Sequence, residues 1–188
     1  MKLSSQEEYG LRCALNLARQ SEKAASADGP MPATTIAQIS ASEGLSTEYA
    51  GKLLGILCKS GLVESVRGRH GGYRLTRSAA EISVASILAA LGSAFYRGET
   101  CERFPGEQDS CVHTTGCSIR SLWSGLQRLI DHVLTRTTLQ DLVMLEERNV
   151  SAWISGHLDV LRDLEPLESF GPVESKAPHN VVVRGIKH

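Results

Sequence analysis

Apolar residues in the first third of the chain recur at helical spacing and predict three short helices. Between positions 11 and 18 they lie three or four residues apart, which predicts an amphipathic helix over residues 5–20. A second helix should begin after Thr34 or Thr35 and end at Gly44, and a third should begin after Ser46. Hydroxyl side chains cap helix N-termini, and glycine ends helices. Two short helices joined by a tight, glycine-containing turn are typical of a helix-turn-helix.

The next stretch has the pattern of a β-hairpin. Two short segments that predict strands, Leu-Val-Glu-Ser-Val at 62–66 and Tyr-Arg-Leu at 73–75, flank the glycine-rich sequence Arg-Gly-Arg-His-Gly-Gly. Its tip concentrates Arg67, Arg69 and His70. A hairpin directly after a helix-turn-helix is typical of a winged helix, whose second helix enters the major groove of DNA while an arginine of the wing can enter the minor groove.

The second half of the chain contains a longer apolar stripe. After a short helix predicted over 83–91, apolar residues alternate spacings of three and four along 119–134, and a further short helix should end near Arg148. Such a stripe can pack against a second copy of itself, although an ordinary core helix would show it too. Because helix-turn-helix proteins usually read paired half-sites, we expect a homodimer. The residues of the stripe are Ile119, Leu122, Trp123, Leu126, Leu129, Ile130, Val133 and Leu134.

These patterns predict a mainly α protein with a small β wing. The 188 residues suffice for one small domain with an extension. We expect a winged helix-turn-helix DNA-binding domain at 1–92, a cysteine-containing loop at 93–117, dimerisation helices at 118–148 and a C-terminal extension at 149–188 with a flexible end. No apolar run reaches the length of a membrane span, and the N-terminus lacks a secretory signal, so the expected location is the cytoplasm.

Charge distribution adds to the DNA-binding hypothesis. The whole chain has a net charge of -1, yet residues 44–77 contain six Lys and Arg against two Glu, a local balance of +4. A basic module on an otherwise acidic chain is expected of a phosphate-binding site. A solvated basic face is the alternative.

Cysteine spacing points to a second kind of chemistry. The chain has an odd number of cysteines, which argues against a disulfide framework. Cys13 and Cys58 fall in predicted helices, where a thiol usually acts as a small buried hydrophobe. Cys101, Cys111 and Cys117 share one polar segment. They could ligate an iron–sulfur cluster, bind zinc together with His113, or act as redox-active thiols.

Features of an enzyme are missing from the sequence. We find no phosphate-cradling glycine loop, no nucleophile beside a base and no dinucleotide fingerprint. His70 and His113 lie in predicted loops without an evident acid or base partner. A redox enzyme or electron carrier is therefore not expected.

Taken together, these residues resemble the Rrf2 family of bacterial regulators over about residues 1–148. The matching pieces are the N-terminal Met-Lys-Leu-Ser-Ser-Gln-Glu-Glu-Tyr-Gly-Leu-Arg, the wing Gly-Leu-Val-x-Ser-Val-Arg-Gly-x-x-Gly-Gly-Tyr-x-Leu, the three-cysteine segment, and a cysteine six residues before a tryptophan at the start of the long helix. The resemblance implies a winged-helix homodimer in which the long helices cross. It also implies operator binding controlled by an iron–sulfur cluster, of the 2Fe-2S or 4Fe-4S type, that responds to redox, nitric oxide or iron status.

The resemblance also assigns residues to the DNA interface. The recognition face would hold Thr47, Glu48, Gly51 and Lys52, and Arg67 would be the wing arginine. One branch of the family has glutamate at the position of Gly51, so no operator sequence is carried over.

For the cluster, the resemblance implies Cys101, Cys111 and Cys117 as ligands. The stretch between Cys101 and Cys111 is longer than is usual in the family. Arg120 stands where the iron–sulfur assembly branch has a ligating histidine, and arginine has no lone pair to offer. The nitric-oxide-sensing branch takes a carboxylate from the partner subunit, and Glu8 occupies that position. Glu8 is therefore the first choice for the fourth ligand and His113 the second. A ligand from the second subunit would make the cluster bridge the dimer and link it to the spacing of the wings.

Overall fold

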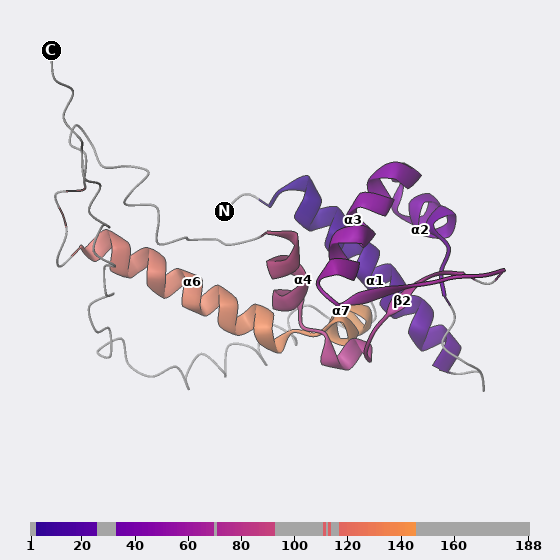
Figure 1. Ribbon diagram of the computed structural model, residues 1–188. Helices are drawn as coiled ribbons and strands as arrows, with labels where there is room; N and C mark the ends of the chain where they lie inside the picture. Colours follow the sequence, from indigo (N-terminus) through magenta and orange to yellow (C-terminus); the bar gives the residue numbers. More distant parts are fainter. Residues whose placement is uncertain are drawn as a thin grey trace, which may run out of the picture.

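The computed structural model describes residues 3–25, 33–69, 71–92, 111, 113 and 117–145. Within them, helices form the body of the molecule and a single two-stranded sheet projects from one side of it, which confirms the predicted mainly α fold with a small β wing (Figure 1). Their bounds are α1 Ser5–Ala25, α2 Ile36–Glu43, α3 Thr47–Lys59, β1 Val63–Val66, β2 Gly72–Leu75, the 3-10 helix η1 Ala79–Glu81, α4 Val84–Leu91, α6 Ser118–Arg136 and α7 Leu139–Leu145.

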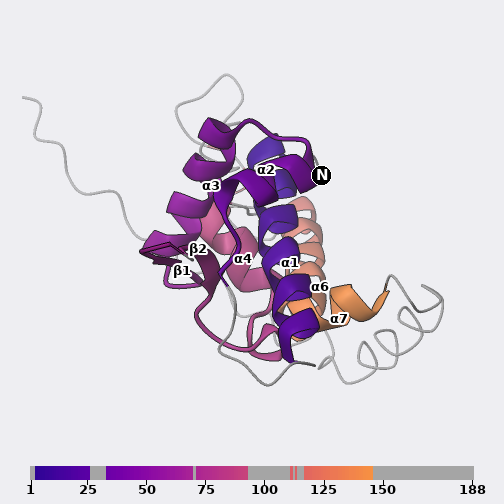
Figure 2. The ribbon, with the colours of Figure 1, turned by 90° about the vertical axis from the view of Figure 1, so that its right-hand side faces the viewer.

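Helix α1 is the centre of the fold. It packs against α2, α3, α4, α7 and β2 (Figure 2). Its buried face meets the apolar faces of these elements in one core, because burying apolar surface is the main favourable contribution to folding. The helix continues to Ala25, so the predicted end at residue 20 was too early. The last turn holds good helix formers, and the Ser21 hydroxyl donates to the Leu17 carbonyl. The largest fully buried side chains are those of Leu17, Ile39, Leu53, Leu54, Leu57, Ile82, Ile87, Leu139, Val63 and Cys13.

The helix-turn-helix forms where the cap residues predicted it. Thr35 and Gln38 make a reciprocal capping box at the start of α2. Gly44 ends α2 in the left-handed conformation, with φ of 66°, which glycine adopts without strain. The Ser46 side chain accepts the Tyr49 N–H at 3.1 Å and starts α3. These local signals set the turn between α2 and α3.

The wing is an antiparallel hairpin that is fastened on both sides of β2. Ser65 of β1 pairs with Tyr73 of β2, and on the other edge Thr34 exchanges two backbone hydrogen bonds with Tyr73, both at 2.8 Å. This bridge was not predicted, because an isolated pair of residues leaves no periodic pattern in the sequence. It ties the middle of the wing to the residue just before the cap of α2.

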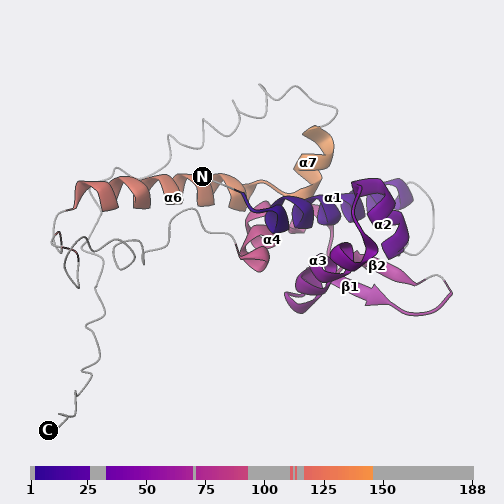
Figure 3. The same cartoon turned by 90° about the horizontal axis from the view of Figure 1, so that it is seen from above.

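The end of the described chain divides into two parts. Helix α7 packs on α1, and Leu139 is fully buried, with its N–H bonded to the Ile82 carbonyl at 2.9 Å. Helix α6 instead extends away from this core and contacts α4 (Figures 1 and 3). Within the expected dimerisation segment 118–148, α6 is thus the helix that projects. No helix in the described ranges is long and apolar enough to cross a membrane.

The first prediction concerns the bridge to the wing. An added Cβ at Gly72 would collide with the carbonyl oxygen of Thr34 and lie 2.6 Å from its carbonyl carbon. Both are backbone atoms that cannot rotate away, so Gly72→Ala should destabilise the protein by about 1–3 kcal/mol. Thermal unfolding followed by circular dichroism measures this.

Gly55→Ala is the matched control. This helical position has open space around a Cβ, so alanine should stabilise by up to about 1 kcal/mol. A Gly72→Ala variant as stable as the wild type would contradict the close approach of Thr34 to β2.

Candidate functional site: nucleic-acid interface and cysteine segment

Helix α3 presents one apolar and one polar face. The apolar face, made by residues 50, 53, 54 and 57, is fully buried. Thr47, Glu48 and Lys52 of the predicted recognition face are exposed. Gly51 is half-buried, and a Cβ there would lie 3.2 Å from the Ile36 side chain of α2. Its small size therefore has a packing reason as well, because it lets α2 and α3 approach each other.

The wing turn depends on glycine at two positions. Gly68 has φ of +109°, which L side chains rarely adopt. A Cβ at Gly71 would lie 2.5 Å from the Val66 carbonyl oxygen. This tight turn carries Arg67 and Arg69, which are both exposed. His70, the third predicted residue of the tip, lies outside the described residues.

Most basic side chains of this module have no acidic partner. Arg74 pairs with Glu64 across the hairpin at 2.6 Å, so these two charges cancel locally. The other five are exposed and form no ion pair among the residues that the structure describes. Unpaired cations on α3, the wing and the segment after it are available for phosphates. They are Lys52, Lys59, Arg67, Arg69 and Arg77.

The cysteine segment meets α6 at its first turn. Cys117 is the N-cap of α6, and its Sγ accepts the Arg120 N–H at 3.4 Å. The Arg120 guanidinium donates to the His113 carbonyl at 3.0 Å. Arg120 therefore holds the preceding segment against the helix that follows it.

The predicted ligands are only partly described. Cys111 and Cys117 are free and half-buried, the side chain of His113 is exposed, and Cys101 lies outside the described residues. In the described ranges, no three His, Cys, Asp or Glu side chains gather as a metal site. The donor types suit an iron–sulfur cluster, whose usual ligands are thiolates.

Glu8 is engaged within its own chain. Its Oε1 accepts from Arg12 Nη2 at 2.7 Å and Nε at 2.9 Å. Arg12 also lies over the Tyr9 ring at 5.5 Å, and Tyr9 meets Tyr49 of α3 edge-on at 6.1 Å. The resemblance pointed to Glu8 as a ligand, and its pairing with Arg12 one helical turn away was not predicted. An i, i+4 pair of opposite charge is the signal that could have shown it.

The two remaining cysteines differ from the candidate ligands. Cys13 is fully buried, and burial, with a smaller effect of Glu43, raises the pKa of its thiol to about 11. Burial also raises the pKa of Cys58. Reactive cysteines need an accessible thiolate, so these two positions are suited to packing.

Comparison with known proteins decides the family. Residues 3–144 match the model of the Rrf2 family, described as iron-dependent transcriptional regulators. The chain belongs to this family. The HTH-type transcriptional regulator IscR of Photobacterium profundum is 34% identical over 187 residues, covering 99% of this chain and 98% of that protein. IscR of Pectobacterium atrosepticum is 34% identical over 147 residues, 78% of this chain and 82% of the relative.

Solved structures agree with the winged-helix fold of this Rrf2 regulator. CymR, the global cysteine regulator of B. subtilis, has a TM-score of 0.58 at 27% identity, covering 76% of this chain and 95% of CymR. IscR of T. potens has a TM-score of 0.58 at 26% identity, covering 80% of this chain and 90% of that structure. The oxidized form of Staphylococcus aureus CymR has a TM-score of 0.55 at 30% identity, covering 76% of this chain and 95% of that structure. The helix-turn-helix and the wing thus belong to a transcriptional regulator.

The second prediction follows from the buried thiol of Cys13. Between about pH 9 and 11 the unfolded chain releases this proton while the folded chain keeps it. The free energy of unfolding should therefore fall as pH rises through this window. Cys13→Ala should make that fall shallower, as measured by urea unfolding at several pH values.

Leu17→Val is the control, because it trims the same buried face without removing an ionisable group. It should lower stability by about 1 kcal/mol at every pH and keep the wild-type slope. Equal slopes for Cys13→Ala and the wild type would show that this thiol does not contribute.

Proposed function

We propose that this Rrf2 regulator binds double-stranded operator DNA as a homodimer, under the control of an iron–sulfur cluster held by Cys101, Cys111 and Cys117. The observation that carries the proposal is that Cys117 caps α6, the projecting helix. A predicted cluster ligand thus lies directly at the start of the predicted dimerisation helix. DNA binding, dimerisation and cluster binding have separate support.

The DNA interface is proposed on α3 and the wing. Thr47, Glu48 and Lys52 on the exposed face of α3 would meet base edges and phosphates in the major groove, with Gly51 allowing close approach. The exposed wing arginines, with His70 beside them in the sequence, would reach the minor groove. The uncompensated positive charge of the module supports both contacts.

Dimerisation is supported by the apolar surface of α6. Four large apolar side chains of this helix remain exposed within the chain: Ile119 at 66%, Leu122 at 57%, Trp123 at 38% and Leu129 at 36%. A contiguous exposed apolar stripe marks an interaction surface. A second copy fits best, because crossed α6 helices would cover both stripes and place two α3 helices for paired half-sites.

The cysteines would link the cluster to this dimer. When bound, the cluster supplies iron–thiolate bonds whose stability depends on redox state. Cys117 would hold it at the first turn of α6, and Arg120 would keep the His113 segment beside that turn. Glu8 of the second subunit remains the first choice for the fourth ligand and would have to leave Arg12; His113 is the second choice.

A second candidate keeps DNA binding and changes the chemistry of the cysteines. In it, the segment is a thiol switch or a structural zinc site. The likeness to CymR, which has been solved in an oxidized form, favours testing it.

The third prediction tests the wing. Arg67→Ala should weaken operator binding by about 1–3 kcal/mol and reduce the salt dependence of binding, because one cation leaves the interface. Fluorescence anisotropy at several salt concentrations measures both. Arg136 is an exposed arginine in the last turn of α6. The matched control Arg136→Ala should bind the operator like the wild type. Unchanged affinity of Arg67→Ala would refute the wing assignment.

The fourth prediction tests the cluster. Native mass spectrometry of the anaerobically purified chain, with visible absorption of the same sample, should show a dimer carrying iron and sulfide together with charge-transfer bands. Cys111→Ala should lose the iron and sulfide mass and the charge-transfer bands while remaining a dimer. Cys58→Ala should keep the added mass and the bands. A dimer carrying zinc, or no added mass even after reconstitution, would support the second candidate.

A further inference from the structure

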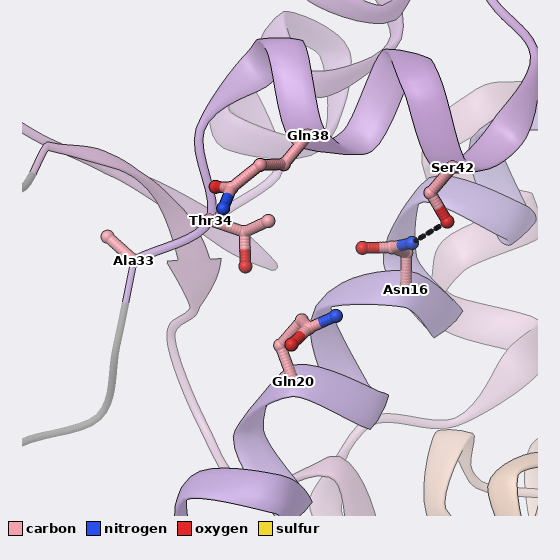
Figure 4. A pocket seen from close by; sticks show the side chains of 6 residues that line it. All are labelled: Asn16, Gln20, Ala33, Thr34, Gln38 and Ser42. Atoms are coloured by element: carbon pink, nitrogen blue, oxygen red, sulfur yellow. Dashed lines mark hydrogen bonds between the residues drawn. The ribbon is translucent and has the colours of Figure 1, made fainter.

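A cavity of about 250 Å³ lies between α1, α2 and the segment that leads into α2 (Figure 4). Its lining includes none of the residues proposed above for DNA contact or for the cluster. All but one of its lining side chains are polar, and none is charged. They are Asn16, Gln20, Ala33, Thr34, Gln38 and Ser42.

Asn16 places a fixed, unpartnered acceptor at this cavity. The residue is only 4% exposed, and its amide nitrogen donates to Ser42 Oγ at 2.8 Å and to Glu43 Oε1 at 2.9 Å. These bonds set the orientation of the amide, because turning it would place its oxygen against the Glu43 carboxylate. The Oδ1 atom is buried without a hydrogen-bond partner among the described residues. Figure 4 shows it pointing toward the space bounded by Thr34 and Gln20.

The donors come from the glutamines. Gln38 Oε1 accepts from the Thr35 N–H at 2.9 Å and from the Thr35 hydroxyl at 2.8 Å, which leaves its Nε2 to donate. Gln20 adds a second carboxamide to the lining. With no basic residue lining the cavity and the Glu43 carboxylate behind Asn16, an anion is disfavoured.

The size and the donor pattern define a class of ligand. A water molecule occupies roughly 30 Å³ in the liquid, so the cavity is too large for one ordered water. Pockets for drug-sized ligands usually have a larger volume, roughly 300–1,000 Å³. A buried acceptor without a partner is costly, and a neutral ligand that donates an N–H and accepts at a carbonyl matches both Asn16 and Gln38.

We propose that this cavity binds a small, uncharged carboxamide whose N–H donates to Asn16 Oδ1 and whose carbonyl accepts from Gln38. Thr34 lines the cavity and pairs with Tyr73 of β2. A bound carboxamide would therefore contact the residue that fastens the wing. Any effect on operator affinity rests on the proposed DNA binding, whereas ligand binding itself does not.

The test uses the full-length, ¹⁵N-labelled chain without DNA, with benzamide as the probe and benzoate as its isosteric anion. Benzamide should shift the side-chain amide resonances of Asn16, Gln20 and Gln38 saturably, and the backbone amide of Tyr73 with them. Benzoate should bind at least about tenfold more weakly, because it offers no N–H and adds a charge. Equal binding of both, or no saturable shift with benzamide, would overturn the proposal.

Variants then assign the binding to the cavity. Asn16→Leu should lower benzamide affinity about tenfold or more. Because Asn16 also joins α1 to α2, the milder Gln20→Leu is the second variant, with Gln140→Leu on α7 as its matched control. Gln20→Leu should weaken binding and Gln140→Leu should not. Wild-type binding by Gln20→Leu, or equal weakening by both, would refute the site. Since no DNA is present, failure here is distinct from failure of operator binding.

Discussion

The apolar face of α1 is the constraint on which the other elements depend. Cys13, Leu17 and their neighbours on this face are fully buried against helices that lie far apart in the sequence. Buried side chains in a close-packed core transmit displacement instead of absorbing it. The directions of α3 and of the wing are therefore set through one shared surface, and a DNA-binding module of fewer than 100 residues keeps a single shape.

Local signals explain why the sequence predicted the DNA-binding module well. Thr35, Gly44 and Ser46 act within a few residues of their own position, so caps and turns could be identified without knowledge of the tertiary structure. The wing was predicted from its glycine-rich turn and the short strand segments on either side of it. Comparison with known proteins then agreed with the family implied by those same motifs.

Long-range features were missed for the opposite reason. The pairing of Thr34 with Tyr73 and the packing of α7, with Leu139 in the core, against α1 join positions tens of residues apart in the sequence. Neither leaves a periodic trace in the sequence. The ion pair of Glu8 with Arg12 was visible as an i, i+4 spacing, yet the resemblance drew attention to the carboxylate alone. At the cysteine segment, the predicted helical segment begins at 118 as α6 does, but the role of Cys117 as the N-cap was not predicted, because cysteine is not among the usual capping residues.

The bridge at Thr34 has a consequence for the energetics of association. A two-stranded hairpin alone is marginally stable in water and would sample many directions. Here the middle of the wing is held on both edges of β2 before any DNA arrives. Ordering a mobile segment on binding opposes affinity, and a preorganised segment avoids much of that loss. The wing can therefore contribute its arginines to the interface as part of a rigid body, with little entropy lost in orienting the hairpin itself.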